Sequence, residues 1–187
     1  MSYYHRACGL KTDGSITCWG NEDNSLVPDP SEGPFTAVTA AGIHTCGIRA
    51  DSTAACWNRL DSYELPGDGY TAIAIAKHRA LYSACGMHTD GTITCREDDI
   101  TPSGRYTNIF ASHGNTCGIR QTDGTIHCAG DTSSEVLYKA DRLLDPPPGR
   151  FTQITTGGNH ACALRTDQTI ECWGANHRGQ TGKPPTR

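Results

Sequence analysis

The stretch Cys8–Trp19, CGLKTDGSITCW, sets the pattern that the rest of the chain repeats. Its two cysteines lie ten positions apart, and a Thr-Asp-Gly turn centred on Asp13 stands midway between them. Short alternating apolar and polar runs on both sides of this turn predict a β-hairpin. A three-residue loop with Gly14 in the left-handed conformation would place Cys8 opposite Cys18, close enough for a disulfide.

Four more cysteine pairs follow with nearly the same spacing. Each pair encloses nine or ten residues with a turn signal in the middle, and together the pairs use all ten cysteines. The predicted disulfides are Cys8–Cys18, Cys46–Cys56, Cys85–Cys95, Cys117–Cys128 and Cys162–Cys172. Ser52 and Gln168 stand where the other turns have glycine, which we expect to cost stability or to change the turn.

A second repeated element, an aromatic residue followed by Thr-x-aliphatic, precedes each later hairpin and predicts a short strand. It begins at Phe35, Tyr70, Tyr106 and Phe151. Successive first cysteines are 38, 39, 32 and 45 residues apart, a period typical of propeller blades or solenoid turns. We therefore expect a single repeat domain over 1–187, with units at approximately 1–34, 35–69, 70–105, 106–150 and 151–187.

The first unit lacks the aromatic-Thr strand, and the sequence stops where a sixth such strand would begin. We therefore expect that the chain does not close a standard ring by itself. Three alternatives remain open: part of a longer propeller, which is favoured, a tightened five-blade ring, or an arc completed by a second copy. Open sheet edges would make self-association through the end blades feasible.

One long connection differs from the others. Thr132 and Glu135 have capping-box spacing, and Pro146 follows the segment. The apolar residues between them lie on one helical stripe: Val136, Leu137, Ala140, Leu143 and Leu144. This pattern predicts a short helix over 133–144, either packed on its own array, which is favoured, or contacting a partner.

Composition excludes several classes of function. The net charge is −4, with no block of basic residues, so nucleic acid and anionic membrane are not expected partners. No apolar run is long enough to insert in a membrane. Ten evenly paired cysteines favour an oxidising compartment and a secreted or extracellular location, and their spacing does not fit structural zinc sites.

The fifth unit carries the most specific motif, Trp173-Gly-x-Asn-x-x-Gly-Gln180, within residues 157–182. This unit resembles the regulator-of-chromosome-condensation repeat superfamily of β-propellers. Other units keep parts of the motif, as at Trp19 and Trp57, whereas Arg96 and Ala129 replace the tryptophan. The resemblance implies an all-β, propeller-like array of five blades, complete or incomplete. The paired cysteines are more similar to extracellular members, such as the secreted β-lactamase inhibitor and the Crinkly-type receptor ectodomains, than to the nuclear exchange factor.

No catalytic motif is present, so we expect no enzyme activity, no cofactor and no metal. The predicted topology puts the Asp-Gly turns at one end of each blade, and the small turns and hairpin exits at the other. Aromatic, amide and imidazole groups on the second end suit recognition of a protein or a sugar. The candidate rim residues are Trp19, His44, Trp57, Arg59, Asn115, His160, Trp173 and Asn176. The tryptophans could equally pack between blades.

We compare four classes of function with this pattern. The favoured one is an extracellular protein-binding propeller, either a piece of a receptor ectodomain or an inhibitor. A carbohydrate-binding repeat lectin is the alternative, although its sites would not be equivalent, because only some units carry tryptophan. A guanine-nucleotide exchange factor is disfavoured by the paired cysteines, and no motif supports an enzyme.

Overall fold

The computed structural model describes ten stretches of the chain: residues 6–20, 33–42, 44–58, 62–78, 81–96, 101–112, 115–130, 145–157, 160–176 and 178–182. Within these stretches there are fifteen β-strands in five antiparallel sheets and no helix. The all-β prediction is therefore confirmed for the described residues. The helix predicted at 133–144 and the rim candidate Arg59 lie outside them.

Each sheet contains strands that are consecutive in the chain, as expected for propeller blades. We number the sheets as blades one to five. Blade one is β1 (Arg6–Leu10) and β2 (Ile16–Gly20); blade two is β3 (Phe35–Ala41), β4 (His44–Arg49), β5 (Ala54–Trp57) and β6 (Ser62–Glu64); blade three is β7 (Tyr70–His78), β8 (Leu81–His88) and β9 (Ile93–Cys95); blade four is β10 (Tyr106–Ser112), β11 (Asn115–Arg120) and β12 (Ile126–Gly130); blade five is β13 (Phe151–Thr156), β14 (His160–Arg165) and β15 (Ile170–Gly174).

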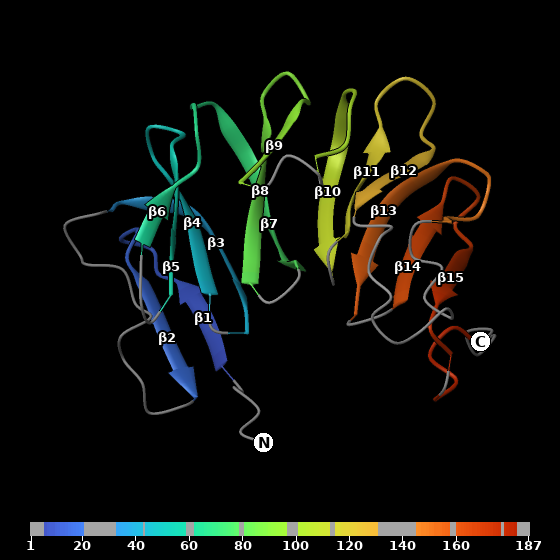
Figure 1. The fold of residues 1–187 in the computed structure, drawn as a ribbon, viewed down its shortest axis with the longest axis horizontal. Helices are drawn as coiled ribbons and strands as arrows, with labels where there is room; N and C mark the ends of the chain where they lie inside the picture. Colours follow the sequence, from blue (N-terminus) through green and yellow to red (C-terminus); the bar gives the residue numbers. More distant parts are fainter. Residues whose placement is uncertain are drawn as a thin grey trace.

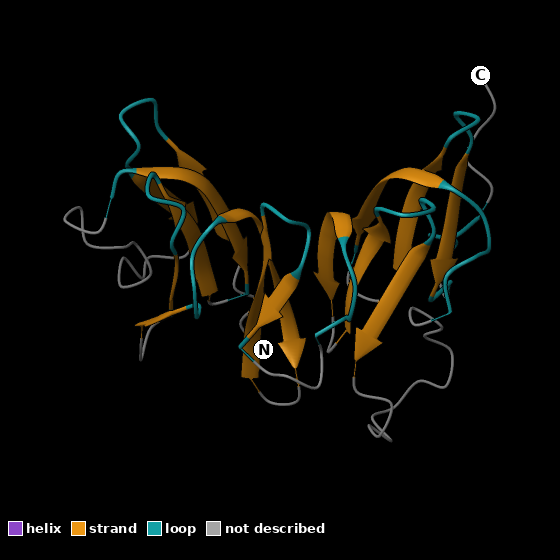
Figure 2. Cartoon of the chain, turned by 90° about the horizontal axis from the view of Figure 1, so that it is seen from above, coloured by secondary structure: helices purple, strands orange, loops and turns teal. Residues whose placement is uncertain are grey.

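The blades follow one another along a curved row in Figure 1, from blade one, drawn in blue, to blade five, drawn in orange and red. The first and fifth blades lie on opposite sides of Figure 1, and Figure 2 shows the described residues as strands and loops alone. The described part of the chain therefore forms an open arc rather than a closed ring, in agreement with the expectation from the sequence.

The hairpin register predicted from the cysteine spacing is confirmed. Cys8 faces Cys18, with Gly9 opposite Thr17, and each of the other four cysteine pairs is also directly opposite. All five disulfides are formed, each with a Cα–Cα distance of 4.0 Å. No free cysteine remains.

The turns keep one conformation whatever residue they contain. Gly14 has a φ of 81°, and Ser52 and Gln168 have φ values of 67° and 70° at the same position. The left-handed backbone is therefore retained by side chains that rarely adopt it. Of the two expected consequences of replacing glycine, a changed turn is wrong, and a cost in stability stays a prediction.

The repeated threonine after each aromatic residue holds a β-bulge. The pairing register shifts by one residue directly after Phe35, Tyr70, Tyr106 and Phe151. At each shift the threonine hydroxyl donates a hydrogen bond of 3.1–3.3 Å to a carbonyl of the second strand. The threonine side chain thus joins the bulged strand to the second strand, which gives a physical reason for threonine at this position.

The repeated glycine after the first cysteine makes room for the aromatic ring. A Cβ atom on Gly47, Gly86 or Gly118 would lie 2.7, 2.3 or 2.5 Å from a ring atom of the aromatic residue in its own blade. These rings are almost fully buried. In blades two to four the glycine after the first cysteine therefore makes room for the ring, whereas blade five has Ala163 at this position.

Neighbouring blades meet through two different faces. We call the side of a blade that carries its disulfide and aliphatic pair the forward face, and the side that carries the post-cysteine tryptophan the backward face. Between blades four and five, Ile119 and Ile126 of the forward face pack with Phe151 and Trp173 of the next blade. Between blades one and two, the Cys8–Cys18 bridge packs with the same kinds of residue. The apolar core is thus divided among the interfaces between blades.

A backbone hydrogen bond fixes each of these interfaces at the turn. The amide of the first-strand aromatic residue donates to the carbonyl of the left-handed turn residue in the preceding blade, over 2.7–2.9 Å. The four pairs are Phe35 to Gly14, Tyr70 to Ser52, Tyr106 to Gly91 and Phe151 to Gly124. The arginine before two of these aromatics binds the same turn, because Arg105 and Arg150 each donate to an aspartate carbonyl there, at 3.0 and 2.8 Å.

Candidate binding rim

The predicted rim residues lie at the end of the blades opposite the aspartate turns. His44, Asn115 and His160 are the first residues of β4, β11 and β14. Asn115 pairs with Gly130 and His160 with Gly174, at the ends of the third strands. The structure therefore brings the small turns and the hairpin exits to one end, as the topology predicted.

The residues that begin β4, β11 and β14 differ in how far their side chains are exposed. His44 is 6% exposed, and Ser83 at the same repeat position is also buried. Asn115 and His160 are half-buried, and Asn176 is exposed in the loop after β15. Among the described polar candidates, the last three can present their side chains to a ligand without rearrangement, so the polar part of the described rim lies over blades four and five.

Two of the three candidate tryptophans do not reach the surface. Trp57 is 5% exposed and Trp173 is 8% exposed, and both pack on the forward face of the preceding blade. Trp57 also makes an edge-to-face contact with Phe35, with ring centroids 5.3 Å apart. Trp57 and Trp173 therefore pack between blades and are not available to bind a ligand. Trp19 differs, because it is 60% exposed on blade one.

The rim over blade five is held by local contacts. The imidazole of His160 lies over Gly157, where an added Cβ would come within 2.1 Å of the ring. The Gly157 amide donates to the His160 carbonyl at 2.9 Å. Asn176 accepts a hydrogen bond of 3.0 Å from the Thr181 amide through Oδ1 and so closes the loop after β15. Glycine before β14 therefore sets the orientation of the histidine, a role that sequence reasoning missed.

The opposite end of the blades is chemically uniform. In all five turns an aspartate Oδ1 accepts hydrogen bonds from the amide and the hydroxyl of the residue two positions later. These bonds, the hydroxyl first and the amide second, lower the pKa of Asp13, Asp51, Asp90, Asp123 and Asp167. The carboxylates are occupied by their own turns, so these aspartates stabilise the turns.

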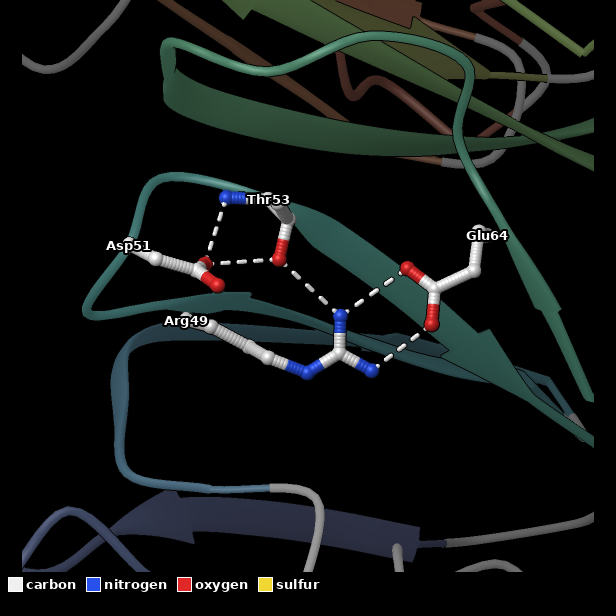
Figure 3. A network of polar contacts seen from close by, with 4 residues as sticks. All are labelled: Arg49, Asp51, Thr53 and Glu64. Carbon is white, nitrogen blue, oxygen red and sulfur yellow. Dashed lines mark hydrogen bonds and ion pairs between the residues drawn. The ribbon is translucent and has the colours of Figure 1, made fainter.

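A polar network fastens the fourth strand of blade two (Figure 3). Arg49 donates from Nη1 and Nη2 to the two carboxylate oxygens of Glu64, at 2.9 and 2.8 Å, and from Nη1 to Thr53 at 3.1 Å. Glu64 belongs to β6, so the bidentate pair joins β6 to the strand two places away. In blade five Arg165 donates from Nε and Nη2 to a single carboxylate oxygen of Glu171, which lies on the adjacent strand.

The histidine in β12 is tied to the core of its blade. The Tyr106 hydroxyl lies 2.7 Å from the Ser103 carbonyl and 2.7 Å from Nδ1 of His127. Because a carbonyl only accepts, the phenol donates to Ser103 and His127 donates through Nδ1. Burial, and then the charge of Arg120, lower the pKa of His127 below its ordinary value of 6.5. The folded state prefers neutral imidazole, so this contribution to stability is present above pH 6.5 and decreases as the pH falls.

The described stretches contain no group of three or more His, Cys, Asp or Glu side chains that could hold a metal ion. The same stretches contain no helix that is long and apolar enough to cross a membrane.

Residues 151–180 match the family model of the Regulator of chromosome condensation (RCC1) repeat. These residues include β13–β15 and the Trp173 motif. The match confirms the resemblance inferred from the fifth unit.

The fold as a whole is similar to known propellers. The Crinkly WD40 ectodomain of the Arabidopsis thaliana receptor kinase ACR4 is 22% identical, with a TM-score of 0.70 over 91% of this chain and 62% of that one. The entire ectodomain of the Physcomitrella patens receptor kinase CR4 is 21% identical, with a TM-score of 0.71 over 90% of this chain and 50% of that one. Prp20p from Saccharomyces cerevisiae, whose structure was described with its binding to Gsp1p and histones, is 14% identical, with a TM-score of 0.68 over 98% of this chain and 59% of that one.

The chain spans 50–62% of the length of these three structures. At this level of identity the similarity establishes the propeller fold and leaves the partner open.

Proposed function

We propose that this chain is an extracellular protein-binding module. The observation that carries the proposal is the set of five disulfides, one across every blade, with no cysteine left free. Such a set forms and persists in an oxidising compartment. The shared fold with two receptor-kinase ectodomains supports the same location. The disulfides also disfavour an intracellular exchange factor, although Prp20p has the same fold.

The binding surface that we propose is the rim over blades four and five. Asn115, His160 and Asn176 lie at this end and retain exposure. Their amide and imidazole groups donate and accept hydrogen bonds, and the varied side chains there contrast with the repeated aspartate turns at the other end. We propose binding rather than catalysis, because the sequence contains no motif for an enzyme.

A lectin is the weaker proposal. Burial of Trp57 and Trp173 removes the aromatic platforms that repeated sugar sites would use. Trp19 keeps an exposed ring, but a single exposed tryptophan does not make equivalent sites.

The test is a binding screen of the purified, disulfide-bonded chain against an array of extracellular proteins, run beside a glycan array. We expect a protein hit whose binding weakens at least about tenfold in Asn115→Ala and His160→Ala. Matched controls are Gln121→Ala and Thr166→Ala, which lie in the same two blades at the turn end and should bind normally. Glycan binding without a protein hit would contradict the proposal, and loss of binding only in the control variants would show that the wrong end was chosen.

A further inference from the structure

Two of the five disulfides receive a threonine hydroxyl from the following blade. Thr45 Oγ1 in blade two lies 3.7 Å from Cys8 Sγ in blade one. Thr116 Oγ1 in blade four lies 3.2 Å from Cys85 Sγ in blade three. Both threonines are 0% exposed, and each comes directly before the first cysteine of its own blade. A disulfide sulfur carries no proton, so the hydroxyl is the donor in both contacts.

Alanine takes the place of this threonine in the other two interfaces. Ala84 packs in the core cluster that contains the disulfide of blade two, and Ala161 packs in the cluster that contains Cys117 of blade four. Both alanines are 0% exposed. This position therefore offers a hydroxyl to the disulfides of blades one and three, and only a methyl group to those of blades two and four.

The two disulfides with a threonine hydroxyl differ in their access to solvent. Cys85 and Cys95 of blade three are 0% and 3% exposed, whereas Cys8 and Cys18 of blade one are both half-buried. The fifth disulfide is also half-buried, but no described threonine donates to its sulfurs. The disulfide of blade one therefore combines access for a reagent with a buried donor at one of its sulfurs.

The position of the hydroxyl determines which sulfur departs in thiol–disulfide exchange. In this reaction an external thiolate bonds to one sulfur, and the other sulfur leaves with the electron pair of the broken bond. A hydrogen-bond donor that is already in place stabilises the departing thiolate. In blade one this donor lies at Cys8, so Cys8 is the better leaving group and Cys18 is the sulfur that is attacked.

We propose that Cys18 is a site of S-thiolation by a small-molecule thiol, with Cys8 as the leaving group and Thr45 as its positioning residue. The sulfur of the small thiolate bonds to Cys18 Sγ while the Cys8–Cys18 bond breaks. Cys8 keeps the electron pair as a thiolate, which the Thr45 hydroxyl holds until it takes a proton from water. One disulfide replaces another, so the step needs no oxidant or reductant besides the thiol. Glutathione, which buffers the secretory compartment, is a thiol of this class.

The modification acts on the interface between blades one and two. Cys8 and Cys18 pack against the cluster that contains Phe35 and Trp57. A mixed disulfide with glutathione adds a charged group at this cluster and removes the cross-link between β1 and β2. The other four disulfides lie in other blades and stay closed. The site lies in blade one and is independent of the binding rim proposed over blades four and five.

The experiment treats the purified, disulfide-bonded chain with reduced glutathione under native conditions, followed by acid quenching, alkylation and peptide mapping. The first product should carry glutathione on Cys18 and the alkyl group on Cys8, and it should form before any product at the fifth disulfide. Thr45→Val keeps the shape of the side chain without the hydroxyl, and it should slow this product at least about threefold, because exchange rates depend on the leaving thiolate. Thr45→Ser should restore the rate. The matched control is Thr116→Val, which removes the equivalent hydroxyl from blade three and should leave the rate at Cys18 unchanged.

Three results would overturn the proposal. Glutathione on Cys8, or on both cysteines equally, would show that the hydroxyl does not direct the exchange. Earlier modification of the fifth disulfide would show that exposure alone sets the order. An unchanged rate in Thr45→Val would remove the threonine from the reaction. Labelling of the buried Cys46 and Cys56 reports whether a variant opens the fold, and if Thr45→Val does so, the product distribution of the unaltered chain decides.

Discussion

Trp57 and Trp19 occupy the same position in successive repeats, yet one is 5% exposed and the other 60% exposed. The difference comes from what lies behind each blade. Trp57 packs on the forward face of blade one, whereas no described blade precedes Trp19, whose ring instead lies 3.4 Å from the Cβ position of Gly9. The same contrast appears at the other end, between the covered Ile126 and the exposed Ile170. In a repeat array, the energetic role of a residue is therefore set by the neighbouring repeat as much as by its own sequence.

The largest expected effect separates the two tryptophans. Trp57→Ala should lower the free energy of unfolding by about 3–5 kcal/mol, because it removes a buried ring between two blades. Trp19→Ala should cost less than about 1 kcal/mol, since most of its ring is already in water. Denaturant unfolding of both variants measures the difference. Equal losses would show that Trp19 is covered in solution and would remove the distinction between interior and end blades.

The second prediction applies the same contrast to the glycines after the first cysteines. Gly86→Ala places a Cβ 2.3 Å from the buried Tyr70 ring, so the ring or the strand must shift, at a cost of about 1–3 kcal/mol. Gly9→Ala meets only the exposed Trp19 ring, at 3.4 Å, and should change stability by less than about 1 kcal/mol. The midpoint of thermal unfolding compares the pair. A stable Gly86→Ala protein would mean that the aromatic ring does not need the glycine.

Much of the blade could be predicted from the sequence, because local spacing determines it. The distance from Cys8 to Cys18 and the intervening turn fixed the register and the disulfide without any long-range information. The contacts between blades could not be obtained in this way. Trp57 and Trp19 look alike in sequence, and only the position of the neighbouring blade distinguishes them.

For the candidate rim, the sequence predicted which end of the blades the residues occupy but did not predict which side chains are exposed. His44, Asn115 and His160 each begin the second strand of their blade, at the end that the topology predicted, but the repeat gave no indication that His44 would be buried. Side-chain exposure depends on loops that vary in length from unit to unit. The Cys-Gly dipeptide of blades one to four was a signal available in the sequence, since a glycine repeated within a strand indicates close packing.

The third prediction concerns access to the disulfides. Cys46 and Cys56 are fully buried between blades two and three, whereas Cys162 and Cys172 on the open forward face are half-buried. Thiol–disulfide exchange requires access to sulfur, so limited reduction followed by alkylation should label the fifth pair well before the second. Peptide mapping over time gives the order. Labelling of Cys46 and Cys56 first would show that the interior interface opens more readily than the end face is attacked.

The smallest expected effect tests whether a neighbouring blade influences the backbone of a turn as well as the packing of side chains. Ser52 and Gln168 both adopt left-handed backbone, at a cost of about 1–2 kcal/mol relative to glycine. Ser52→Gly and Gln168→Gly should each stabilise the chain by about 1 kcal/mol, since glycine also loses more entropy on folding. The gains should be equal although the Ser52 carbonyl accepts the Tyr70 amide and the Gln168 carbonyl has no described partner, because the strain lies within the turn itself.

Denaturant midpoints measure both gains in stability. The opposing control is Gly14→Ala, which should destabilise the chain, because Gly14 is left-handed and its Cβ would meet Pro34 at 2.6 Å. A larger gain for Gln168→Gly than for Ser52→Gly would mean that the neighbouring blade stabilises the strained turn, and the influence of the neighbouring repeat would then extend from side-chain packing to the backbone.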